Sequence, residues 1–221
     1  MRLPLGQSAA IGRRFIDLGP ELTLAVIRTV EAGWPIALAR PEVTVHANEV
    51  TITECLRDAM RTALVRHRFP WRKTMIIAPG TESRSQPDMT VPDGRTDIPL
   101  FLTRVFVRSG EHDPHAILEC KRVAAGDGTL AREYVVEGID RFRIGKYAEN
   151  HRRGFMVGYI LAGTPQGVVD GINAYLIGRS RRPETLSSSP IADAQVFWES
   201  EHPRTADGRP IAVQHALLVV A

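Results

Sequence analysis

The chain has 221 residues, of which 43% are hydrophobic and 24% charged, and its formal net charge is +3. The composition is ordinary for a folded protein. The length corresponds to one medium-sized domain, or to one domain with an N-terminal extension. The small net charge is by itself no argument for nucleic-acid binding, so the distribution of the charges matters more.

The cysteine content and the apolar runs indicate the compartment. Cys55 and Cys120 fall in a predicted helix and a predicted strand, and their spacing matches neither a disulfide framework nor a zinc site. The N-terminus lacks the apolar core of a signal peptide, and no apolar run approaches about 18 residues. We therefore expect a cytoplasmic protein that does not enter a membrane.

The N-terminal part is expected to form an arm and one helix. Residues 1–19 are mixed and glycine-rich, which predicts a loosely held arm. Residues 20–32 have apolar side chains at helical spacing, with Pro20 in the first turn and Gly33 as the expected end of the helix. Residues 34–48 show no regular pattern.

A second helix is predicted from Thr51 to His67. Thr51 and Glu54 have the spacing of a capping box, and apolar residues recur on one face. The C-terminal end and the segment after it are basic, through Arg57, Arg61, Arg66, His67, Arg68, Arg72 and Lys73. Cations at a helix C-terminus are favourable in any protein, and the alternative is contact with phosphate groups.

Strands and helices alternate in the rest of the chain. Three strands are predicted at 73–79, 95–107 and 115–123, with a loop at 83–94 between the first two. Beyond them we expect a helix at 130–143, a strand at 154–162, a helix at 164–178, a loop at 180–190 and strands at 194–200 and 211–220. This order predicts an α/β fold with helices on the faces of one mixed sheet.

Two charged residues stand inside the apolar strand HAILECKRV, residues 115–123. Because strand side chains alternate, Glu119 and Lys121 share one face and Cys120 takes the other. If this strand pairs with the preceding one, Asp97 lies beside Glu119, and two neighbouring carboxylates repel each other. A divalent cation resolves this repulsion, since Mg²⁺ binds oxygen ligands and commonly uses one or two carboxylates. The alternative is a strand with one exposed face that carries a solvated ion pair.

An acidic residue at the start of one strand and Glu-x-Lys in the next resembles the PD-(D/E)XK nuclease superfamily, which has the restriction-endonuclease-like fold. The matching residues are Asp97 and then Glu119, Cys120 and Lys121, and the resemblance extends from Thr51 to about residue 162. The resemblance implies an αβββαβ core within a nuclease-like domain at 51–221, preceded by an N-terminal arm and helix at 1–50. The residue before Asp97 is threonine where the motif has proline, a departure that this variable superfamily tolerates.

The resemblance also implies the chemistry, a metal-dependent nuclease that hydrolyses phosphodiester bonds. Asp97, Glu119 and Lys121 would be catalytic, and Asp97, Glu119 and the backbone carbonyl of Cys120 would hold Mg²⁺, for which Mn²⁺ could substitute. Glu54 is a further expected metal ligand, because members of the superfamily often add a carboxylate from the first helix. The alternative for Glu54 is an exposed helix residue or a cap.

The helix that follows the lysine strand is expected to contact the substrate. The resemblance points to Tyr134 and Arg141 and, beyond the helix, to Lys146, and the alternative is that these are ordinary helix-face residues. DNA is favoured over RNA as the substrate, bound through its phosphates. The phosphate-binding candidates are Arg61, Arg66, Arg72, Lys73, Arg141, Arg143, Lys146, Arg152 and Arg153.

The sequence contains no helicase or ATP-binding motif of its own. By analogy with the superfamily, we expect a helicase-like or other protein partner, or a homo-oligomer, within a bacterial defence or restriction system. The competing hypothesis is a catalytically silent subunit of nuclease-like fold that binds nucleic acid or acts as a scaffold.

Overall fold

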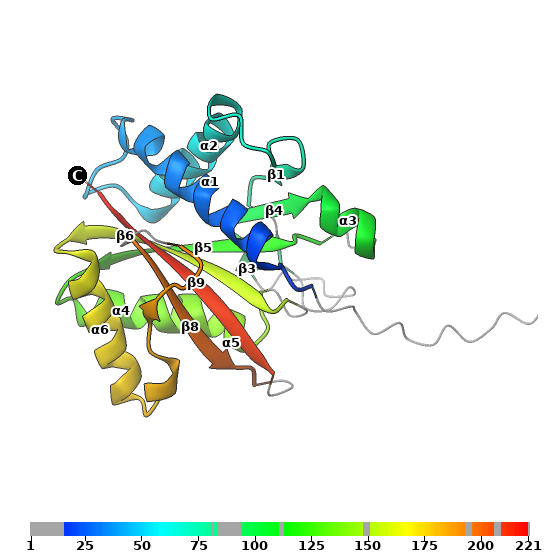
Figure 1. Ribbon diagram of the computed structural model, residues 1–221. Coiled ribbons are helices and arrows are strands. Elements are labelled where there is room, and N and C mark those ends of the chain that lie inside the picture. Colours follow the sequence, from blue (N-terminus) through cyan, green and yellow to red (C-terminus); the bar gives the residue numbers. More distant parts are fainter. Residues whose placement is uncertain are drawn as a thin grey trace, which may run out of the picture.

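A computed structural model describes residues 16–80, 82–83, 94–110, 113–147, 151–192, 196–205 and 209–220. The predicted arm at 1–19 and the predicted loop at 83–94 lie largely outside these residues. The described chain forms a seven-stranded sheet in the order β1-β4-β5-β6-β9-β8-β7, with helices on both faces (Figure 1). The predicted class, α/β with a mixed sheet, is confirmed.

The two ends of the sheet are antiparallel and its centre is parallel. β1 (Met75–Ile77), β4 (Ile98–Leu102) and β5 (Ala116–Ala124) form an antiparallel meander. β6 (Arg153–Ala162) and β9 (Pro210–Val219) continue parallel to β5. β8 (Phe197–Pro203) and the short β7 (Ser187–Ser188) complete the sheet with antiparallel pairings. A separate pair of two-residue strands is formed by β2 (Glu82–Ser83) and β3 (Gly94–Arg95).

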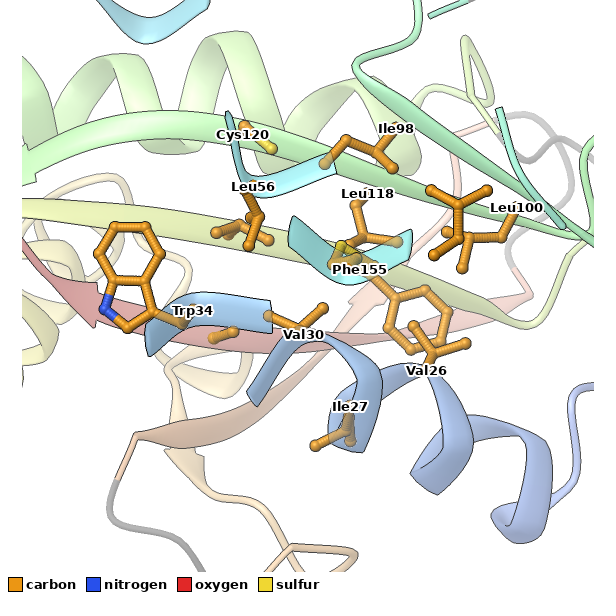
Figure 2. Packing of buried hydrophobic residues seen from close by; sticks show 14 of the residues in the cluster. Val26, Ile27, Val30, Trp34, Leu56, Ile98, Leu100, Leu118, Cys120 and Phe155 are labelled. Atoms are coloured by element: carbon orange, nitrogen blue, oxygen red, sulfur yellow. The ribbon is translucent and has the colours of Figure 1, made fainter. Parts of the chain in front are cut away.

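The first two helices, α1 (Pro20–Leu38) and α2 (Glu49–Arg66), cover one face of the sheet (Figure 1). Leu118 and Cys120 of β5 point into the core between this face and the helices, beside Leu56 and Val30 (Figure 2). α1 therefore shares one hydrophobic core with α2 and the sheet, although it comes from the predicted N-terminal segment.

The opposite face carries α4 (Gly128–Tyr134), α5 (Asp140–Arg143) and α6 (Pro165–Gly178) (Figure 1). A π-helical turn, η1 (Val135–Ile139), joins α4 to α5, and a 3-10 turn, η2 (Arg182–Glu184), follows α6. These elements pack on a second hydrophobic cluster, which includes the odd-numbered β5 residues Ile117 and Val123. Both faces of the sheet are thus covered.

Three predicted boundaries are wrong. α1 does not end at Gly33 but runs on to Leu38, because Gly33 serves helix packing: a Cβ there would lie only 3.0 Å from the backbone of Met60 in α2. The predicted strand at 95–107 ends at Leu102, where the chain turns into α3 (Thr103–Ser109). Val107, which the prediction placed at the end of that strand, is 82% exposed, so burial does not hold it in a strand.

The third correction concerns the start of α2. Its cap is Asn48, whose side chain accepts a hydrogen bond from the Thr51 backbone N–H at 2.8 Å, so the helix begins at Glu49 and not at Thr51. Glu49 then lies in the first turn, where the helix dipole favours a negative charge. None of the described helices has the length and apolar composition needed to cross a membrane. Cys55 and Cys120 are both buried free thiols.

Candidate active site

The candidate site lies at an open edge of β5. β4 pairs with β5 only as far as Leu118. The next backbone N–H groups on that side of β5 therefore have no strand partner. Asp97, in the bend before β4, fills the first gap: its Oδ2 accepts a hydrogen bond from Cys120 N at 2.7 Å. Glu49 fills the second, because its Oε2 accepts one from Arg122 N at 3.2 Å. Two carboxylates therefore replace the missing strand along this edge.

Glu119 is completely buried and only half satisfied. Its Oε1 accepts a hydrogen bond from Arg141 Nη1 at 2.6 Å and lies 2.9 Å from Lys121 Nζ. Its Oε2 is also buried, yet it has no hydrogen-bond donor in the described part of the chain. An unpaired buried carboxylate oxygen is costly, because desolvation of the charge is not compensated. This oxygen is therefore a position that a bound cation or a proton can complete.

Lys121 places its ammonium group among three oxygen atoms. Nζ lies 2.8 Å from the backbone carbonyl of Cys120, 2.9 Å from Glu119 Oε1 and 3.0 Å from Glu49 Oε1. The side chain leaves the sheet face and reaches the open edge of β5, where the carbonyl of Cys120 points. The geometry shows that two carboxylates and this carbonyl form an oxygen environment suited to a cation.

The charges of the site do not balance. Three carboxylates, Glu49, Asp97 and Glu119, face two cations, Lys121 and Arg141. Burial and the nearby Asp97 charge raise the pKa of Glu119 to about 7, against the opposing effect of the two cations. Burial likewise raises the pKa of Asp97, although Lys121 and the Cys120 N–H oppose it. Burial lowers the pKa of Lys121, but the three carboxylates outweigh this effect and hold it above its usual value.

The helical segment after β5 supplies one more side chain to the site. Arg141, in α5 just beyond the π-helical turn, contacts Glu119 and also donates to the Tyr147 hydroxyl at 3.1 Å. Its guanidinium lies 5.5 Å from the centre of the Tyr147 ring. Burial and the charge of Glu119 raise the pKa of Tyr147 to about 12, so its hydroxyl stays protonated and can donate in turn.

Four of the side chains singled out in the sequence therefore come together, Asp97, Glu119, Lys121 and Arg141, and the backbone carbonyl of Cys120 joins them. Glu54 does not contact them in the structure; it forms an ion pair with Arg57 at 2.5 Å. The physical reason is helical geometry, since Glu54 lies five residues after Glu49 and thus roughly 140° around the helix.

Glu49 is the residue that the sequence analysis missed. The signal was Asn48, a good N-cap three residues before Thr51, which places Glu49 in the first helical turn.

Tyr134 occupies a different place from the one expected. It is fully buried in the second hydrophobic cluster, so it has no exposed surface with which to contact a substrate. Its position in the apolar face of α4, against the sheet, is the physical reason. Lys146 is half-buried in the turn beyond α5, and its contact with a substrate stays a prediction.

The Tyr134 hydroxyl begins a second buried polar cluster, the relay, formed by Tyr134, His215, Ser200, His202 and Glu184. Tyr134 OH lies 3.0 Å from His215 Nδ1, and His215 Nε2 lies 2.7 Å from Ser200 Oγ. Ser200 Oγ lies 2.7 Å from His202 Nε2, and His202 Nδ1 lies 2.6 Å from Glu184 Oε2. With both imidazoles neutral, each hydroxyl and ring N–H donates to the next group, so the relay is satisfied from Tyr134 to Glu184.

The donor set at β5 fits a hard divalent cation. No three His, Cys, Asp or Glu side chains within the described ranges are close enough to form a complete metal cluster. Mg²⁺ does not need one, because it is commonly held by one or two carboxylates, with waters and substrate oxygens completing its shell. The unpaired Glu119 Oε2, the adjacent Asp97 and the excess negative charge are what such an ion would compensate.

The candidate phosphate-binding residues fall into two groups. Several are already paired with carboxylates: Arg61 with Asp58, Arg143 with Glu184, Arg152 with Asp17 and Arg153 with Glu199. Arg141 is likewise paired, with Glu119. Arg66, Arg72 and Lys73 are exposed in and after the last turn of α2 and have no carboxylate partner among the described residues.

The comparisons with known proteins identify no relative. The chain matches no protein-family profile and no curated protein, and its structure matches no solved structure.

Proposed function

We propose that this protein is a metal-dependent nuclease built on a restriction-endonuclease-like core. The single observation that carries the proposal is the buried, half-satisfied Glu119, next to Asp97 and Lys121 at the open edge of β5. A purely structural ion pair needs no third carboxylate and leaves no buried oxygen unpaired. The element order α2, β1, β4, β5, α4 with α5, and β6 supports the proposal, because it follows the expected αβββαβ core.

Each residue of the site has a distinct role in phosphodiester hydrolysis. Asp97, Glu119 and the carbonyl of Cys120 would hold Mg²⁺, which supplies an activated water and neutralises charge on the phosphate. Lys121 positions the attacking water or stabilises the negative charge that develops on the phosphate oxygens. Arg141 holds the Glu119 carboxylate in place through its 2.6 Å contact. Water loses a proton as its oxygen attacks phosphorus, and the bond from phosphorus to the sugar oxygen breaks as that oxygen takes up a proton from solvent.

The substrate in this proposal is nucleic acid, with DNA favoured over RNA, within a bacterial defence or restriction system in the cytoplasm. The absence of helicase and ATP-binding motifs favours a helicase-like or other partner, or self-association. In these roles Lys121 and Glu119 act on the metal and the phosphate, and phosphate contacts carry no sequence information directly.

The test is cleavage of labelled single-stranded and duplex DNA and RNA by the purified protein with Mg²⁺, Mn²⁺ or EDTA. Asp97→Asn and Lys121→Met are expected to lower the cleavage rate by at least about 100-fold. Asp170→Asn removes an exposed carboxylate of α6 and serves as the matched control, with unchanged cleavage. Cleavage that survives both site variants, or that proceeds in EDTA, would contradict the proposal.

The second candidate is a subunit of the same fold that binds nucleic acid without cutting it. The observation in its favour is the cation-filled oxygen environment, in which Lys121 already takes the place between Glu49, Glu119 and the Cys120 carbonyl. Tight binding without cleavage of any of these substrates, under both metals and with the partner present, would favour this candidate.

A further inference from the structure

Three aromatic rings stack on one another just after α2, in the segment RHRFPWRK at residues 66–73. The His67 and Phe69 ring centres are 5.6 Å apart, and those of Phe69 and Trp71 are 4.7 Å apart with an interplanar angle of 11°. The three rings thus form a ladder, which we call the aromatic ladder, with Phe69 in the middle.

One end of the aromatic ladder is fixed and the other is open. Trp71 Nε1 donates to Thr29 Oγ1 of α1 at 3.0 Å, and Phe69 and Trp71 pack against the main core. His67 at the other end is exposed to solvent. A ring that is supported from behind and exposed in front is a preformed surface on which a further planar ring can stack.

Cations without acidic partners among the described residues flank the aromatic ladder along the chain. Arg66, Arg68, Arg72 and Lys73 are all exposed, and within the described ranges none of them contacts a carboxylate. Arg57 and Arg61, earlier on the same helix, do have carboxylate partners. The positive charge of the segment is therefore available to an anionic ligand.

The backbone of the segment is held in an unusual conformation. Arg68 has a φ of 50°, in the left-handed region that non-glycine residues seldom adopt. Arg72 Nη1 donates to the Arg68 carbonyl at 3.2 Å and supports this turn. The turn directs the chain so that His67, Phe69 and Trp71, at alternate positions, stack while the residues between them stay exposed.

We propose that the aromatic ladder and its four cations bind a single-stranded segment of nucleic acid. One unpaired base stacks on the exposed face of His67, and the neighbouring phosphates contact Arg66, Arg68, Arg72 and Lys73. Rings that accept bases and cations that follow the backbone are the two elements of single-strand binding without sequence preference. The inference rests on the proposed function in one respect, that nucleic acid is the substrate.

The position of the aromatic ladder sets the length of strand that reaches both places. Glu49 and Arg66 are the first and last residues of α2, so the ladder lies roughly 26 Å from the Glu49 end of the site at 1.5 Å per residue. A strand whose bases stay stacked at about 3.4 Å per nucleotide spans this distance with roughly 8 nucleotides, and an extended strand spans it with fewer.

The test is fluorescence anisotropy of the full chain with a labelled thymidine strand of about 15 nucleotides in EDTA, which prevents cleavage. His67→Ala is expected to weaken binding about five-fold or more, because base stacking is lost. Arg72→Gln should lower the slope of log K against log salt by about 0.7, the value for one phosphate contact on a single strand. Two matched controls lie outside the segment, the exposed Phe106→Leu in α3 and Arg182→Gln in η2, and they should leave affinity and slope unchanged.

Two results would overturn the inference. The first is that His67→Ala binds the thymidine strand with unchanged affinity and Arg72→Gln shows an unchanged salt slope. The second is that a blunt duplex binds more tightly than the thymidine strand. A uridine strand run in parallel assigns the ligand to RNA or DNA by which of the two binds more tightly. Cleavage is measured separately, so the two proposals fail separately. Normal strand binding without cleavage contradicts only the nuclease proposal, and cleavage with unaltered binding by both variants contradicts only the aromatic ladder.

Discussion

The sheet carries two buried polar clusters that are completed in opposite ways. In the relay, from Tyr134 through Ser200 to Glu184, each ring nitrogen and hydroxyl has a partner, and the histidines fit as neutral groups. In the site at β5, three carboxylates meet two cations, and Glu119 Oε2 has no donor within the described residues.

This difference separates a structural cluster from one prepared for a ligand. A satisfied polar network stabilises a unique arrangement of strands, while an incomplete one costs stability until a ligand completes it. Substitutions in the relay should therefore lower stability and leave chemistry intact. Substitutions in the site at β5 should impair the chemistry and should not lower the free energy of unfolding.

The largest expected effect is at Glu119. Glu119→Gln should reduce metal-dependent cleavage by about 10²- to 10³-fold, because the neutral amide is a poor ligand for a divalent cation. In EDTA at pH 8, its free energy of unfolding should be at least that of the wild type. The pKa of Glu119 is about 7 in the folded protein, above its ordinary value of 4.5. The free energy of unfolding of the wild type therefore decreases as the pH rises from about 4.5 to about 7, and glutamine, which does not titrate, removes this decrease.

Urea unfolding at pH 5 and pH 8, beside cleavage assays, checks both halves of this prediction. A Glu119→Gln protein that is markedly less stable than the wild type at pH 8 would mean that the carboxylate is structural.

In the relay, Ser200→Ala should lower the free energy of unfolding by about 2–4 kcal/mol, because it leaves two buried imidazole nitrogens without partners. Ser187→Ala, on the neighbouring strand β7, removes an exposed hydroxyl and should change stability by less than about 0.5 kcal/mol. Cleavage, corrected for the folded fraction, should be normal in both variants. Loss of cleavage in folded Ser200→Ala would place the relay in the chemistry.

The relay also predicts an acid sensitivity. Burial lowers the pKa of His202, in part against the hydrogen bond to Glu184, and lowers that of His215 further. Below about pH 6.5 the histidines of the unfolded chain bind protons that those of the folded protein do not. The free energy of unfolding therefore decreases as the pH is lowered below this value, and the contribution of the histidines is fully present above it. In His215→Gln, the slope between pH 6.5 and pH 4.5 should be smaller by about 1.4 kcal/mol per pH unit.

Urea unfolding across this range measures that slope, with the exposed His46→Gln as the control that should keep the wild-type value. Equal slopes in wild type and His215→Gln would show that His215 is protonated in the folded protein.

The smallest effect distinguishes two carboxylates of α2. Glu49→Gln should lower cleavage roughly 10-fold, since Glu49 acts through Lys121, whose Nζ it contacts at 3.0 Å. Glu54→Gln, in which only the ion pair with Arg57 is lost, should leave cleavage unchanged. Initial cleavage rates of the two variants, measured side by side, show which carboxylate acts at the site. A larger loss in Glu54→Gln than in Glu49→Gln would support Glu54 as the metal ligand that the sequence predicted.

Much of the fold followed from local patterns. Apolar runs located β5, β6 and β9, and helical spacing located α2 and α6 to within a few residues. The errors came where tertiary contact overrides a local signal. Gly33 reads as a helix end but serves the close approach of α1 to Met60, and the apolar residues after Leu102 read as a strand but fold into α3.

The residue pattern by itself predicted the candidate site best on and next to its strands. The two-residue period places Glu119 and Lys121 on one face whatever the rest of the chain does. The sequence also marked Asp97, because an acidic residue there precedes an apolar strand. The α2 side chain could not be assigned, since a small error in the start of that helix rotates each of its residues to another direction, and Arg141 of α5 was indicated only by the family resemblance.

The sequence by itself determined which residues alternate along β5 and which helices carry an apolar face, because those properties depend on near neighbours in the chain. Only the tertiary structure decided that Glu49 reaches Lys121, that Arg141 reaches Glu119, and that Tyr134 turns away into the relay. These contacts join residues from 20 to more than 80 positions apart, and they depend on how the helices dock on the sheet. Docking is set by the packing of the whole core, which no short segment specifies.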